Sequence, residues 1–323
     1  MINLNRIKRV AFGATIFMVS LCSVAAYPDK PVKIVVPFAP GGGNDQLGRL
    51  IAEKLTQITS IPFVIENRGG AGGNLGAEIV SRSLPDGYTL LMASNQVVIN
   101  PSLYTKMGFD VMTDLTPVAI LADVQFLLVT NPELKIKSVS ELIALDKKSP
   151  GKLNHGTPGS GTPQHLSAQL FNFMAGTTLV HVPYKGTGPA IVDLLGGQIQ
   201  LAFGTLPAVE PYAKTGRLTP LALTGTTRSS LFPDVPTLAE AGVSGYESST
   251  WYGLVAPAGT PKAILTLLEK NIQVALSDPE FKKRLIGLGF EPHFTTGTEM
   301  TKIMKSDLLK WSKIIKDTNV KLD

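Results

Sequence analysis

The chain has few of the residues that form disulfides or hold metal ions. Its 323 residues include one cysteine, Cys22, and four histidines. The histidines, at positions 155, 165, 181 and 293, lack the spacing of metal ligands. One cysteine excludes an internal disulfide framework, and we expect neither a metal site nor a cofactor.

Long apolar runs and dense basic clusters are absent after residue 26. The most apolar stretch, residues 118–129, is interrupted by Asp123 and Gln125, so it does not resemble a transmembrane helix. The densest basic cluster, residues 282–284, is typical of a solvated helix face. We therefore expect a soluble globular protein without a nucleic-acid partner.

The motifs of common enzymes are incomplete. Gly159 and Gly161 flank Ser160 directly, which does not fit the Gly-x-Ser-x-Gly elbow, and the phosphate loop and dinucleotide fingerprint also fail. A five-residue helical offset would point Ser160 and His165 apart. We therefore expect that the protein has no catalytic residues and is not an enzyme. The alternative is an exported α/β hydrolase.

Residues 1–26 have a basic start, an apolar run from Val10 to Leu21 and small residues ending at Ala26. This layout is typical of a secretory signal peptide, and we predict a periplasmic protein cleaved after about Ala26. A membrane anchor is the alternative, but about a dozen apolar residues fall short of the roughly 20 that span a bilayer. Lipidation at Cys22 is a third interpretation.

Short β-branched runs alternate with helical patterns along most of the chain. This order predicts an α/β fold with a parallel sheet between layers of helices. The expected strands are 32–36, 62–66, 88–92, 126–130, 152–155, 178–182, 199–203, 218–223 and 252–256. The expected helices are 45–58, 74–83, 139–147, 164–174, 189–195, 236–240, 261–276, 279–288 and 298–313.

Two sets of strands followed by a helical tail predict two lobes. We expect lobe 1 to comprise residues 27–123 and 226–323, and lobe 2 to comprise residues 124–225. The tail would pack back on lobe 1, and a ligand would bind at the loops that follow the strands.

Four loops after expected strands are rich in glycine, and each runs directly into a helix. Glycine lets the backbone approach a ligand, and a helix start offers unpaired N–H groups with a positive partial charge. Several such starts facing one cleft would bind an anion such as a carboxylate. The loops are residues 37–45, 69–74, 156–163 and 183–189.

Several residues of these loops have two open interpretations. Ser160 and Thr162 either hold a carboxylate or belong to a capped helix, with Thr162 at the N-cap. Asp45 either caps the helix that follows it or meets a ligand through water, an amine or a hydroxyl. Asn44 is then the better direct contact for an anion. Arg68 meets an anion or, as we favour, ties down the loop that follows it.

Ten segments carry motifs of one family, among them Gly-Ser-Gly-Thr-Pro-Gln-His-Leu at 159–166. The others are residues 30–31, 35–45, 66–74, 85–90, 181–186, 194–198, 232–237, 240–242 and 256–261. The chain resembles the Bug/TctC-type extracytoplasmic solute receptors of tripartite tricarboxylate transporters. This resemblance implies a two-lobed, type II-like periplasmic-binding-protein (Venus flytrap) fold that closes on one small, usually carboxylated solute.

The resemblance also implies the positions of ligand contacts, including a bound water that would reconcile Asp45 with an anion. Two of these residues also have a structural interpretation. Lys185 is then a surface lysine, and Trp251 is then a core side chain. The predicted ligand-binding residues are Phe38, Gly43, Asn44, Asp45, Ser94, Asn95, Gly159, Ser160, Gly161, Thr162, Gln164, Tyr184, Lys185, Gly186, Gly204, Thr205 and Trp251.

Two positions depart from the family pattern. Gln200 stands where an acid is common, and Gly204-Thr205 replaces an Asp-Asn pair that lines the pocket. The second change removes an acid that could hold a ligand amine. We therefore expect a mono- or dicarboxylate, aromatic ones included, rather than an amino acid.

The expected partners are this carboxylate and the membrane permease subunits of a tripartite tricarboxylate-type transporter. A solute sensor that feeds a signalling partner is the alternative. We expect the receptor to act as a monomer.

Overall fold

The computed structural model describes residues 27–318. The predicted cleavage after Ala26 and lipidation at Cys22 lie outside these residues. Within them, no helix is long and apolar enough to cross a membrane.

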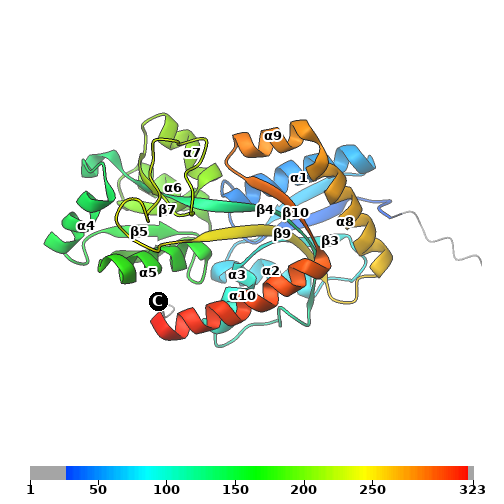
Figure 1. Cartoon of the computed structure of the whole chain (residues 1–323). Helices are drawn as coiled ribbons and strands as arrows, with labels where there is room; N and C mark the ends of the chain where they lie inside the picture. The colour runs from blue at the N-terminus through cyan, green and yellow to red at the C-terminus, as the bar shows by residue number, and fades with distance from the viewer. Residues whose placement is uncertain (1–26, 319–323) are drawn as a thin grey trace, which may run out of the picture.

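The fold has two halves that share the long strand β4 (Leu115–Thr130), as Figure 1 shows. In one half the strand order is β2-β1-β3-β9-β4, with β10 also paired to β4. Its other elements are β1 (Val32–Val36), α1 (Gly43–Thr59), β2 (Phe63–Asn67), α2 (Asn74–Ser81), β3 (Thr89–Ser94), α3 (Gln96–Ile99), β9 (Ser249–Pro257), α8 (Lys262–Ser277), α9 (Pro279–Gly287), β10 (Glu291–Thr296) and α10 (Gly297–Thr318).

The second half continues from β4 in the order β4-β7-β5-β6, with β8 also paired to β4. Its elements are α4 (Val139–Lys148), β5 (Asn154–Thr157), α5 (Pro163–Ala175), β6 (Val180–Pro183), α6 (Thr187–Leu195), β7 (Leu201–Thr205), α7 (Leu206–Lys214) and β8 (Thr219–Leu223). Both halves are therefore α/β, and the expected two-lobed fold is confirmed.

The sheet is mixed, so the expectation of a parallel sheet is only partly correct. Strand β1 is parallel to β2 and β3, and β5 is parallel to β6 and β7. However, β9 runs antiparallel to β3 and β4, and β4 runs antiparallel to β7. Antiparallel strands need no helical crossover between them, so the order of strands and helices alone does not reveal them.

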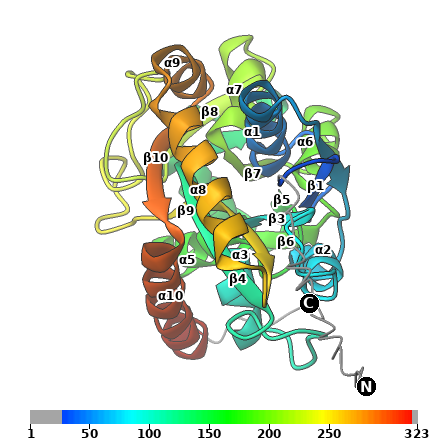
Figure 2. The ribbon, with the colours of Figure 1, turned by 90° about the vertical axis from the view of Figure 1, so that its right-hand side faces the viewer.

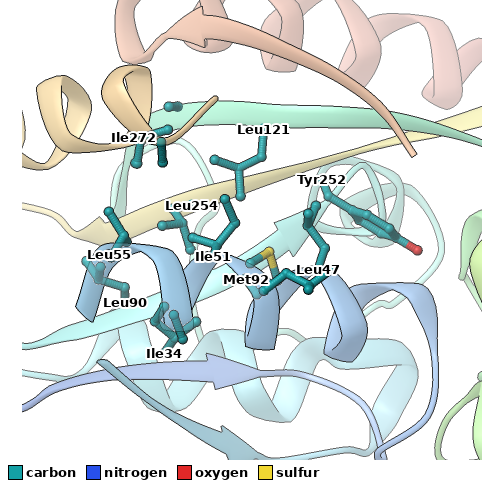
Figure 3. Packing of buried hydrophobic residues seen from close by; sticks show 14 of the residues in the cluster. Ile34, Leu47, Ile51, Leu55, Leu90, Met92, Leu121, Tyr252, Leu254 and Ile272 are labelled. Carbon is teal, nitrogen blue, oxygen red and sulfur yellow. The ribbon is translucent and has the colours of Figure 1, made fainter. Parts of the chain in front are cut away.

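The first half is held together by apolar side chains between the sheet and its helices. Leu47, Ile51 and Leu55 recur every four residues on α1 and are fully buried against the sheet (Figure 3). Helix α8 contributes Leu268 and Ile272 to the same core and lies beside α1 in Figure 2. The helical tail thus packs on the first half, as predicted.

The second half has its own cores, one of which contains Phe126, Phe171 and Phe203. Residues 238–246 pack into this second core, although they follow the predicted end of lobe 2 at residue 225. The lobe boundaries stay a prediction, and this packing favours a later return to lobe 1, near β9.

Several local predictions were wrong. Residues 236–240 form a turn rather than a helix. Thr237 and Glu240 exchange two bonds between backbone N–H groups and side-chain oxygens, and Gly242, with a φ of 104°, follows the turn. Strand β4 begins eleven residues before its predicted start, at Leu115. Helices α3 and α7 and strand β10 were not predicted.

Candidate functional site

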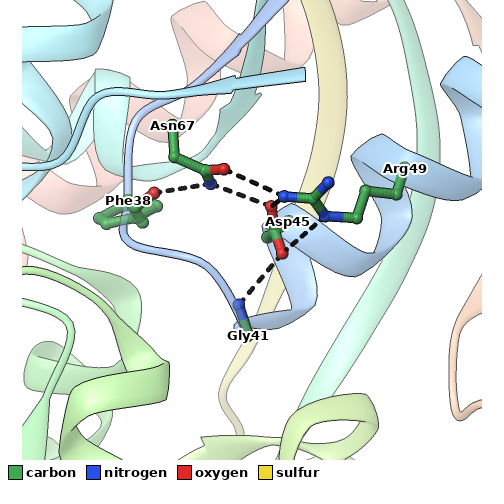
Figure 4. A network of polar contacts seen from close by, with 5 residues as sticks. All are labelled: Phe38, Gly41, Asp45, Arg49 and Asn67. Carbon is green, nitrogen blue, oxygen red and sulfur yellow. Dashed lines mark hydrogen bonds and ion pairs between the residues drawn. The ribbon is translucent and has the colours of Figure 1, made fainter. Parts of the chain in front are cut away.

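The loop between β1 and α1 is fixed by the carboxylate of Asp45 (Figure 4). The Gly41 N–H donates to Asp45 Oδ2 at 3.1 Å, and Asn67 Nδ2 donates to Asp45 Oδ1 at 2.9 Å and to the Phe38 carbonyl at 3.0 Å. Arg49 Nε donates to Asp45 Oδ2 at 3.1 Å. The carboxylate therefore holds the loop that precedes its own helix.

These contacts change two of the sequence interpretations. Helix α1 begins at Gly43, two residues before the predicted start, so Asp45 lies in its first turn and bonds back to the preceding loop. Arg68, which directly follows β2, pairs with Glu66 of that strand. Among the described residues, the side chain of Asn67 rather than that of Arg68 bonds to Phe38 and Asp45.

The second loop, residues 158–162, leads into α5. Thr162 occupies the N-cap position, but its hydroxyl donates to the Gly159 carbonyl at 2.7 Å and does not cap the helix. The N–H of Gly161 donates to His165 Nδ1 at 3.3 Å. Gly161 has a φ of 81°, and a Cβ there would overlap the Asn100 side chain, so glycine is required at this turn.

Hydrogen bonds to backbone carbonyls join the two halves across the cleft. Tyr104 Oη donates to the Ser160 carbonyl at 2.9 Å, and the Ala39 N–H donates to the Lys185 carbonyl at 2.9 Å. The cavity in the cleft, which Phe38 and Pro158 line from opposite halves, encloses about 10 Å³, the room of about one water molecule. A larger solute therefore requires the two halves to separate.

Three helix starts meet at this cleft cavity. Asn44 and Asp45 belong to the first turn of α1, Gln164 to that of α5, and Thr187 is the first residue of α6. Helix starts carry partial positive charge and unpaired N–H groups, which together favour anions. The residues lining the cavity are Phe38, Gly42, Asn44, Asp45, Ser94, Pro158, Gln164, Thr187, Thr250 and Tyr252.

The side chain of Asn44 is the most informative polar group in the cavity. It is only 4% exposed, and neither its Nδ2 nor its Oδ1 has a hydrogen-bond partner among the residues that the structure describes. Burying an amide without partners costs about 1–3 kcal/mol. A ligand that supplies both an acceptor and a donor would recover this energy.

The lining of the cavity carries little side-chain charge. Its described lining contains no lysine or arginine, and its one acid, Asp45, is already bonded to Gly41, Arg49 and Asn67. Burial raises the pKa of the Tyr252 hydroxyl, so this side chain stays a neutral hydrogen-bonding group at physiological pH. An anion here would rely on N–H groups and amides rather than on a side-chain cation.

Five of the predicted contacts line the cavity: Phe38, Asn44, Asp45, Ser94 and Gln164. Gly43 lies at its edge, where a Cβ would be 2.9 Å from Thr205 Oγ1 and 3.1 Å from Tyr252 Oη. Other predicted residues lie at the contacts between the halves, namely Gly159, Ser160, Gly161 and Gly186. Their contribution to ligand binding stays a prediction.

The remaining predicted residues lie away from the cavity lining. The Thr162 hydroxyl bonds to its own loop, and Gly204 faces Val209. Tyr184 donates to Asp193, and the Lys185 side chain is exposed. Asn95 accepts from Thr250 Oγ1 at 2.6 Å.

Trp251 lies on the face of β9 away from the cavity, and its role in ligand binding stays a prediction. Its Nε1 donates to Asp307 Oδ2 at 2.9 Å on the side of β9 opposite the cavity, whereas Tyr252 and Thr250 line the cavity. Successive residues of a strand point to opposite faces, which separates Trp251 from its neighbours Thr250 and Tyr252.

Five lining residues were missing from the prediction: Gly42, Pro158, Thr187, Thr250 and Tyr252. The first three lie in the glycine-rich loops already noted, so their loops carried the signal but not their individual positions. Thr250 and Tyr252 required the register of β9.

Comparison with known proteins identifies the chain. A sequence model described as "Tripartite tricarboxylate transporter family receptor" matches residues 47–320. The chain belongs to this receptor family. Protein BugT of Bordetella pertussis is 36% identical over 324 residues, which cover 99% of each chain.

Two solved structures share the receptor fold. The structure named "R. palustris Rpa4515 with adipate" has a TM-score of 0.89 and 36% identity, covering 92% of this chain and 100% of the other. MatC from Rhodopseudomonas palustris, solved with bound malate, has a TM-score of 0.83 and 30% identity, covering 90% and 100%.

The receptor is a periplasmic solute-binding protein and not an enzyme, as the sequence predicted. The hydrolase alternative is therefore wrong. Among the described residues, no group of three or more His, Cys, Asp or Glu side chains could hold a metal ion.

Proposed function

We propose that this receptor captures a small organic mono- or dicarboxylate between its halves and delivers it to the permease subunits of a tripartite transporter. The observation that carries the proposal is the unpaired amide of Asn44 beside three helix starts. A carboxylate oxygen would accept from Asn44 Nδ2 and from the N–H groups of these helix starts. In the closed, water-poor cleft these bonds gain strength.

The relatives support an aliphatic acid. Rpa4515 and MatC were solved with adipate and malate, and both share the fold over at least 90% of this chain. Both ligands are dicarboxylates, which places them in the class inferred from the cleft.

The cleft also argues against an amino acid. Asp45 is the one carboxylate in its described lining, and three neighbours already use that group. The Gly204-Thr205 pair offers no acid in its place. A ligand ammonium would therefore lose its hydration without gaining an anionic partner.

Thermal unfolding of residues 27–323 tests the proposal. The protein is first unfolded and refolded without ligand, then mixed with mono-, di- and tricarboxylates, aromatic acids, aspartate and glutamate. A ligand at about one hundred times its Kd adds roughly 2.7 kcal/mol of stability. We expect one class of plain carboxylates to raise the Tm by several degrees.

Asn44→Ala should abolish this shift, and Asn271→Ala on α8 is the matched control that should keep it. Selective stabilisation by aspartate or glutamate alone would refute the plain-carboxylate class. If no acid in the panel stabilises the refolded protein, the capture of carboxylates is refuted as well.

A further inference from the structure

A second and larger pocket lies on the opposite face of β9. Thr250 and Tyr252 point into the carboxylate cleft, whereas Ser249 and Trp251 point into this pocket, which encloses about 410 Å³. Its volume falls within the range of small-molecule sites. We call it the rear pocket.

Both halves of the fold wall the rear pocket. Helix α10, drawn in red in Figure 1, contributes Ile303 and Trp311, and α5 of the second half contributes Leu166, Leu170 and the 72% exposed Phe173. Seven of the fifteen lining residues are thus apolar or aromatic. Such a surface favours a ligand with an apolar body.

The polar part of the rear pocket is acidic. Asp123 of β4, Glu247 before β9 and Asp307 of α10 line it, and Lys310 is its one cation among the described residues. No ion pair joins Lys310 to any of these carboxylates in the part of the chain that the structure describes. Lys310 Nζ lies instead 5.6 Å from the ring centroid of Trp311.

Burial leaves Asp307 and Asp123 with a deficit of stabilising positive charge, although His293 Nδ1 lies 3.5 Å from Asp123 Oδ2. Burial raises the pKa of Asp307, and this effect outweighs the bond from Trp251 and the nearby Lys310. Burial also raises the pKa of Asp123, with Glu291 and Asp307 adding to the rise and His293 opposing it. A bound cation would relieve this deficit, since opposite charge stabilises an ionised carboxylate.

We propose that the rear pocket binds a small organic cation that has an aromatic or branched aliphatic body. The ammonium would lie between Asp307 and Glu247, with Trp251 and Trp311 beside it. Indole rings attract cations electrostatically, and Lys310 already makes such a contact with Trp311. This site is separate from the carboxylate cleft, because its lining lies on the other face of β9.

The chain supplies its own reporter for this proposal. Its two tryptophans, Trp251 and Trp311, both line the rear pocket. Titration of the full receptor with 2-phenylethylammonium, followed by tryptophan fluorescence, therefore reports on this pocket. We expect a saturable change, and we expect neutral 2-phenylethanol, which has the same ring, to bind at least about tenfold more weakly.

Substitutions distinguish a cation-binding site from a groove that binds the ligand only through apolar contacts. Asp307→Asn combined with Glu247→Gln should weaken 2-phenylethylammonium by about tenfold, and it keeps an acceptor for the Trp251 N–H. Lys310→Gln should tighten binding severalfold, a gain that misfolding would not produce. Asp234→Asn, at an exposed acid outside the pocket, is the matched control and should change nothing.

Three results would overturn the proposal. One is the absence of saturation at millimolar 2-phenylethylammonium. Another is equal affinity for the neutral alcohol. The third is unchanged affinity in the double acid variant together with weaker binding in Lys310→Gln.

Discussion

At the scale of single residues, Asn44 and Asp45 are adjacent in the chain but have different tasks. Among the described residues, neither polar atom of the Asn44 amide has a partner, whereas the oxygens of Asp45 are bonded to Gly41 and Asn67. We infer that Asn44 meets the ligand and that Asp45 shapes the loop. The two roles predict different consequences of substitution.

Asp45→Asn should destabilise the receptor by about 1–3 kcal/mol, because the Gly41 N–H and the Asn67 amide then compete for one acceptor. Arg49→Gln is the comparison. The Arg49 side chain is 54% exposed, so its ion pair with Asp45 should contribute less than about 1 kcal/mol. Urea unfolding measures both, and equal losses would contradict the assigned roles.

His155 predicts a pH dependence of stability. Burial, together with the stacked rings of His181 and His165, lowers its pKa well below the ordinary value of 6.5. Below pH 6.5 the imidazole of His155 is therefore protonated in the unfolded chain but not in the folded protein. The free energy of unfolding is highest above pH 6.5 and decreases as the pH falls below it.

His155→Leu should make this loss shallower, by up to about 1.4 kcal/mol per pH unit, with little difference from the native chain at pH 8. Neither ring nitrogen of His155 has a hydrogen-bond partner in the described part of the chain, so leucine leaves no polar group unpaired. Urea unfolding from pH 8 to pH 5 measures the slopes. Parallel slopes would show that His155 does not titrate in this way.

At the scale of elements, the start of α6 sets how closely the two halves approach. A Cβ on Gly188 would overlap the carbonyl oxygen of Pro40 in the opposite half. Gly188 does not have a positive φ, so its role is to leave space rather than to allow an unusual backbone.

Gly188→Ala should therefore hinder closure without harming either half. We expect carboxylate affinity to fall at least about tenfold, while the stability of the ligand-free protein changes by less than about 1 kcal/mol. Gly287→Ala, at a helical glycine with open space around it, is the matched control. Calorimetric titration with the stabilising acid measures the affinity of both variants. Unchanged affinity in Gly188→Ala would refute the closure argument.

At the scale of the whole molecule, β9 separates two pockets that both include residues from the two halves. The carboxylate cleft lies on one face, and the rear pocket with α5 and α10 lies on the other. Asn95 lines the rear pocket and accepts a hydrogen bond from Thr250, which lines the cleft. Movement of the halves should therefore change both pockets.

This arrangement predicts coupling between the two ligands. Saturating 2-phenylethylammonium should change the affinity for the carboxylate by about fivefold or more, and the carboxylate should change the affinity for the cation by the same factor. Calorimetric titrations in both orders measure these factors. Independent affinities would mean that the rear pocket does not follow closure of the cleft.

The sequence by itself determined the family, the two α/β halves and the loops that form the cleft. These features are local, because the periodicity of strands and helices and the glycine-rich turns depend on residues that are close in the sequence. Thus β1 was predicted residue by residue, and Phe38, Asn44 and Gln164 were predicted contacts that line the cleft cavity.

Only the tertiary structure decided the register of β9 and the antiparallel pairing of β4 with its neighbours. A shift of one residue moves a strand side chain to the other face, so Tyr252 lines the cleft and Trp251 lines the rear pocket. The rear pocket likewise joins α5 to α10, which lie more than one hundred residues apart in the chain. Such long-range packing leaves no local periodicity in the sequence, because each helix must only present an apolar face to some partner.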